Sequence, residues 1–117
     1  MPYNRGDVVL VLFPDSNLAT AKRRPALVVQ VDRPQTGLTQ TIVAVITSNL
    51  SRAGHPSRVM TPRSSPQGPR MGLLSDSVIM TDNLATVLDS KIDRAIGHCD
   101  DMQPVDAALR DTLGLGS

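Results

Sequence analysis

The hydrophobic residues of the first half of the chain gather in short runs bounded by proline, glycine and polar residues. Val8 to Phe13 is an unbroken apolar run of strand length, which predicts a strand buried on both faces. Residues 26–31 follow Pro25, a position where a strand tolerates proline, and residues 41–47 are rich in β-branched side chains. We therefore expect three strands within the first 47 residues.

Polar segments separate these strands and follow the last of them. Residues 15–24 lack periodicity and end in three consecutive bases, which predicts a loop, and residues 32–40 predict a turn. Residues 48–70 contain four prolines and four arginines, so we expect a mobile surface loop there. Within that segment only residues 58–60 have the character of a short edge strand.

The last third of the chain changes from strand to helix patterning. Residues 72–80 predict a strand, whereas residues 87–92 and 94–97 form short elements of ambiguous type. From Asp101 onward, with Asp100 or Asp101 as the cap and Gly114 as the stop, apolar residues recur on one helical face. Because the strands do not alternate with helices, we expect one mostly β (α+β) domain over residues 1–117, a small antiparallel barrel with a C-terminal helix.

Composition excludes several classes of protein. The chain has 117 residues with one cysteine and two histidines, so we expect no disulfide framework, no metal site and no cofactor. Its longest apolar run is far too short to span a membrane, and its N-terminus lacks the pattern of a signal peptide. We expect a cytoplasmic protein without a membrane partner.

The small net charge of +1 hides an uneven distribution. Residues 1–75 hold nine Lys or Arg and three Asp, whereas residues 76–117 hold three bases and eight Asp. Ten of the twelve bases are arginine, which binds phosphate through a fixed fork of donors. The first two thirds of the chain are therefore expected to present a basic face to phosphates, or to an acidic peptide.

Five segments, in the same order and spacing, make the chain similar to the MazF/PemK family of bacterial toxins. They cover nearly the whole sequence: residues 5–9 (RGDVV), 24–29 (RPALVV), 42–49 (IVAVITSN), 72–78 (GLLSDSV) with 82–87, and 91–97 with 105–115. The resemblance implies an SH3-like barrel of the type that CcdB also has, assembled as a homodimer. It implies metal-independent cleavage of single-stranded RNA, an antitoxin with an acidic disordered tail, and DNA binding by the toxin–antitoxin complex.

The resemblance also implies a catalytic centre at Arg24 and Thr47, with Asp82 as a candidate base. RNA is cleaved without metal when its 2′-hydroxyl attacks the adjacent phosphorus, which requires charge stabilisation and proton transfer. Arg24 provides fixed charge and Thr47 a hydroxyl at a strand end, but the base stays open. The candidate substrate-binding residues are Lys22, Arg23, Ser48, Asn49, Arg58 and Asn83. We expect the 15–24 and 48–70 loops to line the substrate groove.

Two features keep other functions open. Ala85 replaces an arginine that is frequent in the family, and the chain has only two aromatic residues, Tyr3 and Phe13, for stacking on bases. The first alternative is therefore a catalytically weak relative that binds an antitoxin or RNA. The second is a gyrase poison on a CcdB-type barrel, against which the Arg24–Pro25 pair and Thr47 argue.

Overall fold

The computed structural model describes residues 3–14, 17, 19–31 and 39–116. The turn expected at residues 32–40 lies almost entirely outside these residues, as does part of the 15–24 loop. In chain order the elements are β1 (Asp7–Pro14), β2 (Ala21–Val28), β3 (Gln40–Thr47), β4 (Arg58–Thr61), α1 (Gln67–Arg70), β5 (Ser77–Leu88), the 3-10 turn η1 (Asp89–Lys91), β6 (Ile92–His98) and α2 (Gln103–Leu113).

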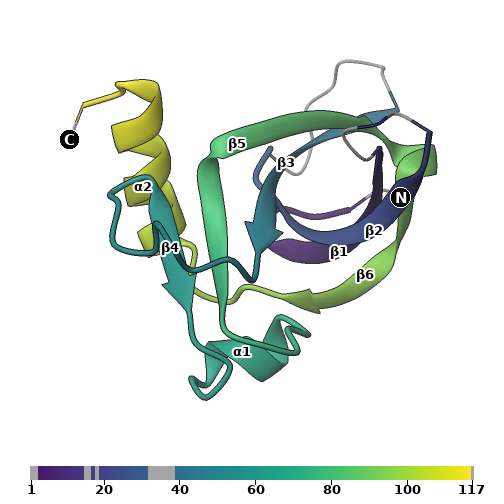
Figure 1. Ribbon diagram of the computed structural model, residues 1–117. Helices are drawn as coiled ribbons and strands as arrows, with labels where there is room; N and C mark the ends of the chain where they lie inside the picture. Colours follow the sequence, from purple (N-terminus) through teal and green to yellow (C-terminus); the bar gives the residue numbers. More distant parts are fainter. Residues whose placement is uncertain (1–2, 15–16, 18, 32–38, 117) are drawn as a thin grey trace.

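The strands form one antiparallel sheet in the order β4-β5-β3-β2-β1-β6. Figure 1 shows the sheet curling round on itself, with α2 beside β4 and the first part of β5. The prediction of a mostly β, antiparallel fold with a C-terminal helix is confirmed, and Arg58–Thr61 is the edge strand expected there.

Each face of the curled sheet carries a core cluster. Val8 and Leu27 belong to a core cluster on one face, whereas Val9, Val11 and Ala26 belong to a second cluster on the other. Successive residues of a strand point to opposite faces. The predicted burial on both faces is confirmed at Val8, Val9 and Val11, whereas Leu12, later in the same apolar run, is 40% exposed.

Two strands have different limits from those expected. Strand β2 begins at Ala21 instead of Pro25 and ends at Val28, because residues 21–25 pair with β1 from Pro14 to Leu10. Residues 21–24 are therefore strand and not loop, although their side chains are exposed. Strand β5 begins at Ser77 instead of residue 72 and continues to Leu88, so residues 82–86 are also strand. A hydrophobic pattern does not detect strand segments whose side chains face solvent.

The C-terminal helix closes one side of the sheet. Helix α2 begins at Gln103, whose backbone N–H donates to the Asp101 carboxylate at 3.1 Å, and it ends at Gly114, whose φ of 69° suits glycine. Arg5 ties the helix to the sheet by donating to the Val29 carbonyl and to Asp106. Within the described residues, no helix is long and apolar enough to cross a membrane.

Candidate functional site

The pairing between β2 and β3 stops halfway along both strands. It covers Ala26–Val28 opposite Val43–Val45, but β3 continues to Thr47 and β2 starts at Ala21. The Val29 N–H donates to the Ile42 carbonyl on β3, and alternate residues of an antiparallel strand face the same neighbour. The nitrogen of Pro25 therefore faces β3 and has no hydrogen to donate, so the two strands separate at this point.

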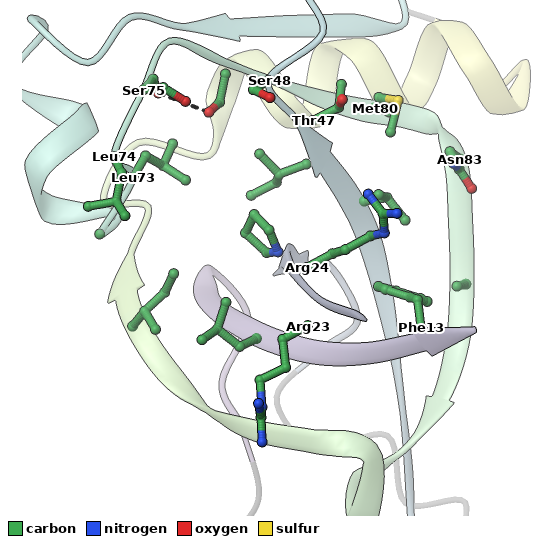
Figure 2. Close-up of a pocket in the computed structure, with 18 residues that line it drawn as sticks. Phe13, Arg23, Arg24, Thr47, Ser48, Leu73, Leu74, Ser75, Met80 and Asn83 are labelled. Atoms are coloured by element: carbon green, nitrogen blue, oxygen red, sulfur yellow. Dashed lines mark hydrogen bonds between the residues drawn. The ribbon is translucent and has the colours of Figure 1, made fainter. Parts of the chain in front are cut away.

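A pocket of about 680 Å³ occupies the separation between the strands. Its lining includes residues from β1, β2, β3, β5 and β6 and from the segment before β5: Leu10, Phe13, Arg23, Arg24, Pro25, Val45, Ile46, Thr47, Ser48, Gly72, Leu73, Leu74, Ser75, Ser77, Met80, Asn83, Ala85 and Ile96. Figure 2 shows these side chains around the opening. Five of the nine predicted site residues lie here: Arg23, Arg24, Thr47, Ser48 and Asn83.

The two adjacent arginines of β2 point in different directions because neighbouring strand residues face opposite sides. Arg24 shares a face with its β1 partner Val11 and extends across the pocket on the side of Phe13 (Figure 2). Arg23 extends instead toward β6, where its Nε lies 3.6 Å from the Asp93 carboxylate. Arg24 is thus the arginine placed for a ligand inside the pocket, with Arg23 at its outer side.

Thr47 ends β3 at the wall opposite Arg24. The Asn49 N–H donates to the Thr47 Oγ1 at 3.1 Å, which fixes the orientation of the hydroxyl group and leaves its hydrogen available to another acceptor. Ser48, the next residue, is exposed on the same wall. A cation and hydroxyl groups therefore converge on one opening, an arrangement suited to a phosphate group.

Another wall of the pocket, formed by the segment before β5, is apolar. The sequence did not predict that this segment belongs to the site. Leu73 is buried, whereas the side chain of Leu74 is 88% exposed at the rim. This segment lies close against β6: a Cβ on Gly72 would overlap the Ile96 carbonyl, and one on Gly97 the backbone of Met71. Of residues 48–70, which were expected to line the groove, only Ser48 does so.

The remaining predicted site residues do not line the pocket. Asp82 forms an ion pair with Arg58: its Oδ2 accepts from Nη2 at 3.1 Å and its Oδ1 lies 2.8 Å from Nε. Neither residue belongs to the lining. The hydrogen bond from Arg58, aided by its charge, lowers the pKa of Asp82 from its ordinary value of 3.8. Lys22 and Asn49 are exposed just outside the pocket, next to Arg23 and Ser48 in the chain.

The uneven charge distribution is partly neutralised within the molecule. Four arginines of the first 75 residues pair with aspartates of the last third: Arg5–Asp106, Arg23–Asp93, Arg58–Asp82 and Arg70–Asp100. The basic face is therefore smaller than the sequence suggested, and the charged residues that line the pocket are Arg23 and Arg24.

Comparison with known proteins assigns the chain to a family. The model of the PemK-like, MazF-like toxins of type II toxin–antitoxin systems matches residues 4–113. The chain belongs to this family. The endoribonuclease MazF6 of Mycobacterium tuberculosis is 35% identical over 107 residues, which cover 89% of this chain and 90% of that one. Endoribonuclease EndoA of Bacillus subtilis is 33% identical over 118 residues, covering 98% and 97%.

Solved structures of MazF-like proteins share the fold. An endoribonuclease in complex with its cognate antitoxin from Mycobacterial species superposes with a TM-score of 0.74 at 21% identity, over 99% of each chain. The part of this MazF-like chain that the structure describes contains no cluster of three or more potential metal ligands. Ala85, one of the positions where the resemblance led us to expect another residue, lies in the pocket lining.

Proposed function

We propose that the chain is an endoribonuclease toxin that cleaves single-stranded RNA in the cytoplasm without a metal ion. Membership of the MazF-like family supports this proposal, as do the names of its relatives MazF6 and EndoA. The observation that carries it is the pocket between β2 and β3, where Arg24 and the Thr47 hydroxyl face each other across an open cleft.

The proposed reaction requires only the substrate and protein side chains. The 2′-oxygen of the RNA bonds to the adjacent phosphorus and loses its proton, while the bond from phosphorus to the 5′-oxygen breaks and that oxygen gains a proton. The products are a 2′,3′-cyclic phosphate and a 5′-hydroxyl. Negative charge grows on the non-bridging phosphoryl oxygens, and the Arg24 guanidinium stabilises it there. Thr47 donates a second hydrogen bond to the same phosphate.

The apolar part of the pocket suits the bases of a single strand. Phe13 provides an aromatic face beside Arg24, and Leu74 provides an exposed aliphatic side chain at the rim formed by the segment before β5. Bases that are splayed out of a single strand stack on such surfaces, whereas paired bases do not reach them. The pocket therefore favours single-stranded RNA over a duplex.

The same pocket accounts for the proposed inhibition by an antitoxin. An acidic segment that becomes ordered on binding would pair with Arg24 and cover the apolar wall, and so exclude RNA. We also propose a homodimer, because the exposed Leu113 and Leu115 at the end of α2 would be buried in a twofold interface. Light scattering of the purified chain measures the mass of the particle directly, and a monomer would remove the dimer from the proposal.

The test is cleavage of a long single-stranded RNA by purified protein in EDTA. We expect discrete fragments with 2′,3′-cyclic phosphate ends, and a loss of about 10²–10³-fold in rate in Arg24→Ala, the effect of removing one charge-stabilising donor. Thr47→Ala should also slow cleavage strongly, whereas Arg23→Ala should retain most activity. If the folded wild-type protein leaves the RNA intact, the proposal of an endoribonuclease fails in favour of a binding relative.

A further inference from the structure

Strand β5 contains an irregularity immediately beside the pocket. Met80 pairs with Val45 and Leu84 with the adjacent Ala44, so three residues of β5, 81–83, have no partner on β3. Figure 1 shows β5 turning a corner between its two parts. Bulges of this kind bend the strand and redirect its side chains, and they leave the extra residues without ladder partners.

The first bulge residue is anchored toward the interior. Thr81 is fully buried, and both its N–H and its Oγ1 donate to the Ser57 carbonyl, at 3.1 and 2.5 Å. Its Oγ1 also lies 2.9 Å from the Thr112 Oγ1 on α2. Because the Thr81 hydrogen is used on Ser57, Thr112 is the donor in that contact. The bulge is thus tied to the segment before β4 and to the C-terminal helix.

The second bulge residue is anchored on the outer side. Arg58, the first residue of β4, donates from Nη2 to the Asp82 Oδ2 at 3.1 Å, and its Nε lies 2.8 Å from Oδ1 in the same ion pair. The Arg58 side chain is only 15% exposed. A fork of this kind constrains both position and orientation, which a single contact does not. Both Asp82 oxygens are engaged by Arg58, on a side chain that lies outside the pocket lining.

The third bulge residue is the one that reaches the pocket. Asn83 lies in the lining, and within the described part of the chain its side-chain amide makes no hydrogen bond. An amide group offers two donor hydrogens and an acceptor oxygen, which match the edges of an unpaired base. With residues 81 and 82 both anchored, the position of Asn83 is set by its neighbours and not by contacts of its own.

We propose that Arg58 and Asp82 are positioning residues, which hold the 81–83 bulge so that Asn83 contacts a base next to the cleaved bond and sets the sequence preference. This inference rests on the proposed ribonuclease function. It differs from a role of Asp82 as the general base, in which the carboxylate would have to reach the 2′-hydroxyl inside the pocket.

The experiment compares cleavage patterns of one long single-stranded RNA, with every cut mapped and the total rate recorded. We expect Asp82→Asn and Asn83→Ala to reduce the preference for the wild-type cut sequence about tenfold, the size expected for one lost hydrogen-bonding contact. The total rate should fall less than the preference. The double variant Arg58→Asp with Asp82→Arg, which rebuilds the pair in reverse, should recover the wild-type pattern. Asp100→Asn breaks the exposed Arg70–Asp100 pair and serves as the matched control.

Two results would overturn the inference. Loss of cleavage at every site in Asp82→Asn, without recovery in the reversed pair, would assign Asp82 to the chemistry. An unchanged cut pattern in both Asp82→Asn and Asn83→Ala would remove any role in sequence preference.

Hydrogen exchange of the 81–84 amides provides a readout that does not depend on cleavage. It should accelerate in Asp82→Asn and return to normal in the reversed pair. If the wild-type protein does not cleave RNA, the proposed function fails, and unchanged exchange in Asp82→Asn would then refute the anchoring of the bulge separately.

Discussion

The two halves of strand β2 differ in burial and in the number of neighbouring strands with which they pair. Ala26 and Leu27 pair with β1 on one side and β3 on the other, and Val28 pairs with β3 while its carbonyl accepts from the Gly6 N–H. All three are fully buried. Residues 21–25 pair only with β1 and have exposed or half-buried side chains. The half that is held on both sides supports the fold, and the half that is held on one side carries Arg24 into the pocket.

Strand β5 repeats this division on the other side of the pocket. Its first part, residues 78–80, pairs with both β3 and β4, whereas residues 84–88 pair with β3 alone. The bulge at 81–83 separates the two parts and brings Asn83 to the pocket. In both strands, a doubly paired segment fixes the position of a neighbouring segment that is open to a ligand, so stability and function depend on different residues only a few positions apart.

The largest expected effect is on the doubly paired half of β2. Leu27→Ala removes a fully buried side chain from the core and should lower the free energy of unfolding by about 2–5 kcal/mol. Arg24→Ala, three residues away, should change it by less than about 0.5 kcal/mol, because its side chain is exposed. Urea denaturation of both variants measures the difference. Equal losses of stability would show that the two halves of β2 are not distinct.

The next largest effect should come from the contact between β6 and the apolar wall of the pocket. In Gly97→Ala the new methyl group overlaps the backbone of Met71 and Arg70, and the resulting shift should cost about 1–3 kcal/mol. It should also displace Leu73 and Leu74 and weaken RNA binding. Gly54→Ala is the matched control, because a Cβ there meets no atom within 4 Å. Calorimetry and RNA titration check both variants, and identical behaviour would contradict the close approach.

A smaller effect is expected where the two halves of β2 meet. Pro25→Ala restores a backbone N–H that faces β3, so the ladder can extend toward Ile46 and narrow the opening. Cleavage should fall about five- to tenfold, since displacing a reacting group by ~1 Å already costs much of the benefit of positioning. Stability should change by less than about 1 kcal/mol, because the new hydrogen bond offsets the lost rigidity of proline.

Hydrogen exchange shows directly whether the ladder extends in this variant. Protection of the residue 25 amide together with slower cleavage is the expected combination. An unprotected amide and an unchanged rate would mean that the missing N–H of Pro25 is not what keeps the strands apart.

The sequence predicted the apolar strand segments well and the solvent-facing strand segments poorly, for a physical reason. The apolar pattern of Val8 to Phe13 and of residues 41–47 reports burial, and both strands are present with nearly the expected limits. Residues 21–24 and 84–86 are held in strands by backbone pairing with their neighbours, and their side chains are largely polar or small. Local sequence does not encode which distant strand will supply those hydrogen bonds.

The site was predicted in part because the resemblance supplied residues that local pattern did not. Arg24 and Thr47 do meet at one pocket, although their catalytic roles stay predictions. Leu73 and Leu74 were missed because their place at the pocket depends on Gly72 and Gly97, which allow two backbones to approach closely. Phe13 was visible as a rare aromatic residue, but its place opposite Lys22 follows only once residues 21–24 are recognised as strand.

The smallest effect concerns acid, and it tests the anchor of the open half of β5. The Arg58 hydrogen bond lowers the pKa of Asp82 below 3.8, so in the acid range the folded protein binds fewer protons than the unfolded chain. The stability that the pair contributes should therefore be present at neutral pH and be lost as the pH falls through the lowered pKa. Because Asp82 is 38% exposed, solvent screening keeps this contribution small. Urea denaturation of wild-type protein and Asp82→Asn should differ at pH 7 and converge as the pH falls below the ordinary carboxyl pKa of 3.8, and Arg58→Met should behave like Asp82→Asn. A difference that does not shrink as the pH falls below 3.8 would mean that the charge on Asp82 does not hold the bulge in place.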